Sequence, residues 1–240
     1  RAHHWIALAV GTAALLASCG GSDGDDDPTT VIDDSTARGT LIVSPPQRVA
    51  SYEPNAFWDL LLAARNGQSL RDAAGAAACG IDFHRLEYQT VGALDEPTAA
   101  SGVLMVPTGA APECSGPRPI VVYAHGTSTD KGYNLAAVSD PDNAAFTESL
   151  MIAAVFAAQG YVVVAPNYVG YDTSTLGYHP YLNADQQSKD MIDALTAARQ
   201  SLGAVAASTT TDDGRLFLTG YSQGGHVAMA THRAMQAAGQ

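Results

Sequence analysis

The sequence predicts an α/β fold in which a mostly parallel sheet is flanked by helices. Two short apolar runs, at residues 119–124 and 161–165, are bounded by turn-forming residues, and a third apolar strand is expected at residues 215–219. Uninterrupted apolar runs of this length are typical of strands that are buried on both faces of a parallel sheet. Helical patterns separate the three runs, and the alternation of strands with helices indicates an α/β architecture.

The composition agrees with a globular body and excludes several classes of function. The chain has 240 residues, of which 46% are hydrophobic and 15% are charged, so it can bury a sizeable core. Its formal net charge is -12. Such a chain lacks the basic surface with which proteins bind a nucleic-acid backbone. We therefore expect neither a nucleic-acid-binding protein nor a basic helix on a membrane surface.

The first 18 residues are expected to form a signal peptide of the lipoprotein type. The apolar run at residues 5–17 is shorter than the roughly 20 residues of a membrane-spanning helix, which leaves a transmembrane anchor as the weaker alternative. Residues 16–19 read Leu-Ala-Ser-Cys and resemble a bacterial lipobox. The resemblance implies that Cys19 becomes the first mature residue and carries the lipid. Gly20 after it favours the outer membrane.

Residues 19–40 are expected to form a disordered acidic tether. They are rich in aspartate, glycine and other small residues, and such a segment buries too little apolar surface to offset the entropy of ordering it. A calcium loop is the alternative, but the aspartates lack the spacing and the terminal glutamate of an EF-hand. The globular body is therefore assigned to residues 41–240.

Cys79 and Cys114 are the two cysteines that remain once Cys19 is assigned to the lipid. An even number of cysteines in an exported, oxidising setting favours a disulfide between them. Two separate buried thiols are the alternative, because the distance between the two residues does not follow from the sequence.

The first elements of the body follow from its hydrophobic patterns. Residues 51–65 carry apolar side chains at helical intervals and predict a helical lead-in. Residues 83–90 and 99–106 read as two strands, and the turn-rich stretch 95–97 joins them into a hairpin.

Three further helices are expected around the central strands. Residues 146–157 place apolar side chains on one helical face, and Gly160 stands at the position where a helix commonly ends. Residues 185–202 and 227–237 have the same helical character.

A nucleophile motif follows directly on the apolar run at 215–219. Residues 220–226 read Gly-Tyr-Ser-Gln-Gly-Gly-His. A catalytic serine needs a sharp strand-to-helix turn, and small residues two positions before and after it leave room for the backbone. The helix N-terminus behind it also favours developing negative charge. Ser222 is therefore predicted to be the nucleophile, with a merely structural turn serine as the alternative.

Residues 123–127, Tyr-Ala-His-Gly-Thr, resemble a His-Gly oxyanion loop at the end of the first buried strand. Acyl transfer needs two preorganised N–H donors, commonly one from the residue after the nucleophile and one from such a loop. Gln223 is the expected first donor. Thr127 is the expected second donor, with Gly126 as its rival. His125 is expected to shape the loop or to pack, and not to act as the catalytic base.

Together these motifs resemble the α/β-hydrolase superfamily, and more narrowly its secretory lipase family and related bacterial lipoprotein esterases. The resemblance extends from about residue 79 to the end of the chain. It rests on residues 123–127, 165–171, 179–182 and 220–225. It implies an α/β-hydrolase fold and hydrolysis of carboxylic esters through a serine.

The chain departs from the secretory lipases in the segment after the second buried strand. The family commonly reads Asp-Tyr-x-Gly-x-Gly there. In this chain Asn167 stands in place of the aspartate and Asp172 in place of the last glycine.

The acid and the base of a catalytic triad are missing from the residues after Ser222. The order in this superfamily is Ser, then Asp or Glu, then His, but the 18 residues that follow Ser222 contain no Asp or Glu. His226 and His232 lie on the helix that begins at the nucleophile, so neither can approach the serine as a base. We therefore expect the catalytic Asp and His beyond Gln240, and little or no activity from the 240-residue chain alone.

The leading hypothesis is an exported, lipid-anchored serine hydrolase that cleaves carboxylic esters through an acyl-enzyme at Ser222. A non-catalytic surface lipoprotein that binds through the same fold is one alternative, and a peptidase or polyester depolymerase is another. The expected partners are a small-molecule or lipid ester and, through the lipid on Cys19, the membrane. No metal-binding or nucleotide-binding pattern occurs in the sequence, so no metal and no cofactor are expected.

Overall fold

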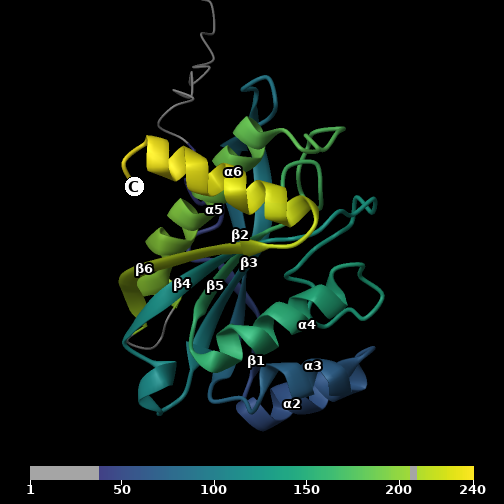
Figure 1. Ribbon diagram of the computed structural model, residues 1–240, viewed down its shortest axis with the longest axis vertical. Helices are drawn as coiled ribbons and strands as arrows, with labels where there is room; N and C mark the ends of the chain where they lie inside the picture. The colour runs from purple at the N-terminus through teal and green to yellow at the C-terminus, as the bar shows by residue number, and fades with distance from the viewer. Residues whose placement is uncertain (1–37, 206–209) are drawn as a thin grey trace, which may run out of the picture. The chain divides into compact units, whose positions relative to one another are not determined.

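The body of the protein is a six-stranded sheet with helices packed on both faces, as seen in a computed structural model that describes residues 38–205 and 210–240 (Figure 1). The predicted signal peptide, the lipidation site Cys19 and most of the predicted tether lie outside the described residues. The last residues of that tether pack on the body. Arg38 forms an ion pair with Asp193 at 3.0 Å, and the Gly39 amide donates to the Gln89 carbonyl.

The sheet is mixed. Its strands are β1 (Gln47–Tyr52), β2 (Gly80–Val91), β3 (Pro97–Thr108), β4 (Pro117–Ala124), β5 (Val162–Pro166) and β6 (Thr211–Gly220). They lie in the order β1-β2-β3-β5-β4-β6. The pairs β1/β2, β2/β3 and β3/β5 are antiparallel, whereas β4 pairs in parallel with both β5 and β6. The predicted parallel strands therefore form one half of the sheet, and the predicted hairpin begins the other half.

Helices cover each face of this sheet in two groups. They are α2 (Pro54–Ala63), α3 (Gly67–Ala74), α4 (Phe146–Val155), α5 (Ala184–Val205) and α6 (Gln223–Ala237), with short 3₁₀ turns η1 (Pro112–Cys114) and η2 (Ala157–Gln159). In Figure 1, α5 and α6 lie above the sheet, and α2, α3 and α4 lie below it. None of the helices in the described part of the chain is both long and apolar enough to cross a membrane.

The predicted elements are found, together with one strand that was not predicted and with interruptions in two of the predicted helices. The lead-in contains helices, but a strand, β1, precedes them, and Asn66 in the left-handed conformation (φ 61°) separates α2 from α3. Only the last two residues of β1, Ser51 and Tyr52, fall in the stretch expected to be helical, and its first four residues show no strand pattern because this edge strand buries no continuous face. The helix that ends at Gly160 is interrupted after Val155, where it tightens into η2.

The two central strands form the middle of the core. All five residues of β5 and the last six of β4 are buried, as expected for strands covered on both faces. The third predicted strand, β6, is less buried than these two. Among the described strands it has a neighbour on one side only, and 47% of Phe217 is exposed.

Cys79 and Cys114 form the predicted disulfide, and both are buried. The bond joins the residue before β2 to the turn η1 before β4, across a sequence separation of 35. It therefore restricts the unfolded chain at the start of the hairpin and at the start of the central strand.

Loss of this disulfide is expected to lower the free energy of unfolding by about 3–4 kcal/mol, because closing a loop of this length in the unfolded chain has roughly that entropic effect. Chemical denaturation of the Cys79→Ala, Cys114→Ala double variant measures the loss. The native protein under reducing conditions is the matched control and is expected to unfold at the same denaturant concentration as the variant. A variant as stable as the oxidised protein would contradict this expectation.

Candidate active site

Ser222 sits in a sharp turn between β6 and α6. Its backbone adopts φ 55° and ψ −122°, a conformation that is strained for any residue but glycine. The turn is closed by the Gly224 amide, which donates to the Tyr221 carbonyl at 2.8 Å. Ser222 is exposed, and its hydroxyl has no hydrogen-bond partner within the described residues. The strand-to-helix elbow predicted from the sequence therefore presents this hydroxyl at the surface.

Two glycines allow the elbow to lie directly against the end of β4. A Cβ atom on Gly224 would be 1.9 Å from the Ala124 carbonyl oxygen, and one on Gly220 would be 2.5 Å from the same oxygen. Both contacts are with backbone, which cannot rotate away. The elbow and the residues after Ala124 thus come together because the motif has glycine at both positions.

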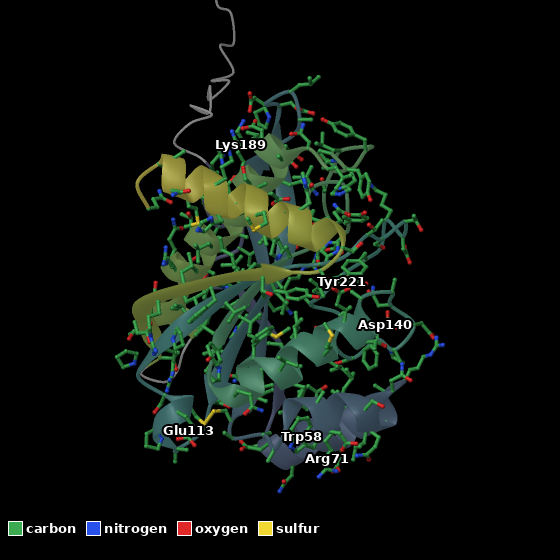
Figure 2. All side chains as sticks on the ribbon, in the orientation of Figure 1. Trp58, Arg71, Glu113, Asp140, Lys189 and Tyr221 are labelled. Carbon is green, nitrogen blue, oxygen red and sulfur yellow. A yellow bond between two sulfur atoms is a disulfide. The ribbon has the colours of Figure 1, made fainter. Side chains whose placement is uncertain are left out.

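The elbow residue Tyr221 covers Gly126 of the candidate oxyanion loop. A Cβ atom on Gly126 would lie 2.7 Å from the ring of Tyr221. Figure 2 shows Tyr221 at the turn between β6 and α6, and 61% of this residue is exposed. The side chain before the nucleophile therefore packs on the loop that carries the second candidate donor.

His125 is fully buried and packs between two aromatic rings. Its ring lies 4.3 Å from that of Tyr133 and 4.0 Å from that of Tyr168, centroid to centroid, in stacked arrangements. Its Nε2 atom lies 3.0 Å from the Asn167 carbonyl oxygen. Burial lowers the pKa of His125 to about 4. The enclosed ring packs under residues 125–127, and its two nitrogens face the carbonyl oxygens of Gly126 and Asn167 and not the Ser222 hydroxyl.

Glu148, on the first turn of α4, contacts Gly126 and two nearby tyrosines through its carboxylate. Its carboxylate accepts hydrogen bonds from the hydroxyls of Tyr123 and Tyr133, both at 2.7 Å, and a longer one from the Gly126 amide at 3.4 Å. Burial and the nearby carboxylate raise the pKa of both tyrosines, so their hydroxyls stay protonated and donate. No sequence motif marked Glu148, because its partners come from other elements.

The two candidate oxyanion donors are unpaired within residues 38–205 and 210–240. Neither the backbone N–H of Gln223 nor that of Thr127 has an acceptor there, whereas the backbone N–H of Gly126 points to the Glu148 carboxylate. This difference favours Thr127 over its rival Gly126 as the second donor. The side chain of Gln223 is buried.

The departure from the secretory lipase pattern is accommodated by one buried polar chain. The Asn167 side chain donates to the Ser101 hydroxyl at 3.0 Å, and that hydroxyl donates to Asp172 at 2.6 Å. Asp172 also pairs with Arg85. Asn167 in turn accepts from the Leu135 amide at 2.8 Å. The side-chain amide of Asn167 can both donate and accept hydrogen bonds. The carboxylate stands instead at Asp172, where its charge is paired with that of Arg85.

A second buried carboxylate anchors the segment after β5. Asp190 of α5 accepts from the Tyr88 hydroxyl at 2.6 Å and from the Val169 amide at 2.7 Å. Burial raises the pKa of Asp190 to about 7. Neither Asp190 nor the other described acidic residues and histidines gather in groups of three or more that could hold a metal ion.

A cavity of about 580 Å³ lies next to the elbow, between α4 and the end of β6. Gly220 and Tyr221 are among its lining residues, and half of the others belong to α4, including the apolar Met151, Ile152 and Val155. Ser222 is not part of its lining. The cavity thus adjoins the elbow without enclosing the candidate nucleophile.

Comparison with known proteins finds similarity to a lipase family and to solved hydrolase structures. The sequence model of the secretory lipase family matches residues 143–239. The crystal structure of the rice cell wall degrading esterase LipA from Xanthomonas oryzae aligns with 84% of the chain at 35% sequence identity and a TM-score of 0.67. A Legionella pneumophila protein described as a hydrolase aligns with 80% of the chain, at 21% identity and a TM-score of 0.64. No curated protein sequence matches the chain.

These alignments confirm the α/β-hydrolase fold and the resemblance to the secretory lipases. The chain covers 46% of the LipA structure and 47% of the Legionella structure, so it spans less than half the length of each.

Proposed function

We propose that this α/β-hydrolase, which resembles the secretory lipases, cleaves carboxylic esters through an acyl-enzyme formed on Ser222. The observation that carries the proposal is the position of Ser222, exposed in a strained turn at the N-terminus of α6 and followed by the Gln223 backbone amide, which has no acceptor among the described residues. Strain of this kind persists only where surrounding contacts hold it, and it is common at catalytic residues.

In the proposed reaction, the Ser222 oxygen attacks the ester carbonyl carbon while a base removes the hydroxyl proton. The amides of Gln223 and Thr127 donate to the oxyanion of the tetrahedral intermediate. The intermediate collapses, the alcohol leaves with a proton from the same base, and the acyl group remains on Ser222. Water then attacks the acyl-enzyme by the same steps in reverse, and the carboxylic acid is released.

The acid and the base of the triad are proposed to come from sequence beyond Gln240 in the full-length protein. His125 is enclosed between aromatic rings, and His226 and His232 are exposed on α6 behind the elbow. The greater length of the LipA structure leaves room for such a contribution.

A comparison of substrates tests whether the protein cleaves ester bonds or amide bonds. The full-length protein is expected to hydrolyse p-nitrophenyl esters of short and medium acyl chains, and to leave peptide p-nitroanilides intact. The amine of an amide leaves only when it is protonated, whereas p-nitrophenolate leaves without a proton. A peptidase, which can supply that proton, would therefore cleave both classes. Hydrolysis of the anilides would favour the peptidase alternative, and hydrolysis of neither class would favour the binding protein.

We also propose export and lipid attachment at Cys19, which would place the enzyme in the bacterial cell envelope. The Leu-Ala-Ser-Cys sequence at residues 16–19 and the Cys79–Cys114 disulfide, which suits an oxidising compartment, support this proposal. Metabolic labelling with a palmitate analogue is expected to mark the native protein and not the Cys19→Ser variant. Equal labelling of the two proteins would contradict lipid attachment at Cys19.

A further inference from the structure

The segment His179-Pro180-Tyr181, between β5 and α5, contacts both residues whose amides were assigned to the oxyanion hole. We infer that His179 and Tyr181 are positioning residues that hold the two donors in place, His179 through Gln223 and Tyr181 through Thr127. The inference rests on the proposed function, since it assigns a role within the proposed oxyanion hole.

The contacts of His179 define which of its ring nitrogens carries the proton. Nδ1 lies 2.8 Å from the Val169 carbonyl oxygen, which can only accept, so Nδ1 donates. In the neutral ring Nε2 then accepts, and the side-chain amides of Gln223 at 2.6 Å and Gln187 at 3.3 Å donate to it. Burial lowers the pKa of His179, so the ring remains the neutral acceptor that this arrangement needs.

The ring of His179 is itself fixed from several elements. It lies 4.7 Å from the Tyr171 ring and stacks at 5.7 Å on that of Tyr168, measured between centroids. The Val169 carbonyl that it meets belongs to a residue whose amide is bound by Asp190. These contacts hold the segment after β5 in place. The hydrogen bond between His179 and the Gln223 side chain fixes Gln223 relative to that segment.

This hydrogen bond acts at the most strained point of the elbow. Ser222 precedes Gln223 with φ 55° and ψ −122°, so the peptide between them can lower its energy by rotating. Such a rotation would turn the Gln223 amide away from the nucleophile. The buried side chain of Gln223, held by the acceptor on His179, opposes this rotation and keeps the amide beside the Ser222 hydroxyl.

Tyr181 makes the second, weaker contact. Its hydroxyl lies 3.4 Å from the Thr127 hydroxyl, and 53% of the residue is exposed. The Tyr181 amide donates to the His179 carbonyl at 2.7 Å, across Pro180, so the two side chains project from one tight turn. The same three residues thus span the distance from the helix that carries the first donor to the loop that carries the second.

The test measures oxyanion stabilisation separately from folding, in the full-length protein. For His179→Ala we expect kcat for a p-nitrophenyl ester to fall by about 10²-fold, the size of effect seen when one oxyanion donor is lost, with KM changed little. The affinity for a trifluoromethyl ketone, whose adduct with serine carries an oxyanion, is expected to fall by a similar factor. Tyr181→Phe is expected to have a smaller effect in the same direction.

A conservative variant of His179 and a double variant of His179 and Gln223 distinguish a positioning role from a general effect on stability. His179→Gln retains a donor and an acceptor and is expected to recover part of kcat. Gln223→Met keeps the backbone amide but removes the bond to His179, so it is expected to lower kcat as His179→Ala does, and the double variant is expected to fall no further. Tyr178→Phe, on the same segment but bonded to Glu96, and His232→Ala, exposed on α6, are matched controls with native kinetics.

Native kcat and inhibitor affinity in Gln223→Met would overturn the inference, even if His179→Ala fails to fold. Full additivity in the double variant would overturn it as well. Failure of the proposed function has a different signature, because the native protein would then hydrolyse no ester, or Ser222→Ala would hydrolyse esters as fast as the native protein, whatever the result for His179.

Discussion

Replacement of Ser222 by alanine is expected to lower kcat for ester hydrolysis by about 10⁶-fold in the full-length protein, the loss seen when the nucleophile of a serine hydrolase is removed. Alanine cannot form the acyl-enzyme, and the oxyanion donors alone give only a small residual rate. The fold is expected to be unaffected, because the Ser222 side chain is exposed and has no hydrogen-bond partner among the described residues. Initial rates and thermal unfolding of the two proteins measure both quantities.

His226→Ala is the matched control for this substitution. His226 lies on the first turn of α6, four residues after the nucleophile, and is exposed. If the base comes from elsewhere, as proposed, His226→Ala hydrolyses esters at the native rate. A loss comparable to that of Ser222→Ala would identify His226 as the base and would contradict a base beyond Gln240.

Replacement of Gly224 by alanine is expected to cause the largest loss of stability. The added Cβ would stand 1.9 Å from the Ala124 carbonyl oxygen and 2.8 Å from that of His125. Both are backbone atoms in the centre of the fold, so α6 would have to move away from β4. We expect a loss of about 4 kcal/mol or more in the free energy of unfolding, or failure to obtain soluble protein.

Gly225→Ala is the matched control, one residue along the same helix. Its Cβ would meet only the Gly220 carbonyl oxygen, at an ordinary contact distance of 3.7 Å. Alanine also favours the helix over glycine by about 1 kcal/mol. The Gly225→Ala protein is therefore expected to be as stable as the native protein or slightly more so. Equal stability of the two glycine variants would show that the elbow is not packed against β4 in this way.

The elements that the sequence predicted best are those whose pattern depends on local contacts. The central strands β4 and β5 are buried on both faces, so their continuous apolar runs were read correctly. The elbow was found because the nucleophile turn needs small residues at fixed positions, and Gly220 and Gly224 meet that need by their close approach to Ala124. The disulfide pairing followed from the number of cysteines and the expected compartment.

The parts that the sequence did not predict depend on contacts between distant elements. Strand β1 has no apolar face of its own and is defined by its pairing with β2. Glu148 and Asp190 appear in the sequence as ordinary acidic residues of helices. Their roles follow from hydrogen bonds to Tyr123, Tyr133, Tyr88 and the Val169 amide, which come from other strands and loops.

The same limit applies to the candidate site. The sequence left Thr127 and Gly126 as rivals for the second donor, and the contact of the Gly126 amide with Glu148 favours Thr127. The family motif that contains His179 was visible in the sequence, but its partner Gln223 lies 44 residues away. The first result depends on the position of α4 beside the loop after β4, and the second on the position of α6 beside the segment after β5.

The central claim is that Ser222 is the nucleophile, and covalent labelling tests it most directly. A fluorophosphonate probe is applied to the full-length native protein, and the modified residue is located by mass spectrometry. Trypsin is expected to release residues 216–233 as one peptide, in which Ser222 is the only serine. We expect this peptide to carry the probe in a 1:1 ratio, with loss of ester hydrolysis in proportion. Loss of activity with the probe on another residue, or labelling that persists in Ser222→Ala, would contradict the assignment.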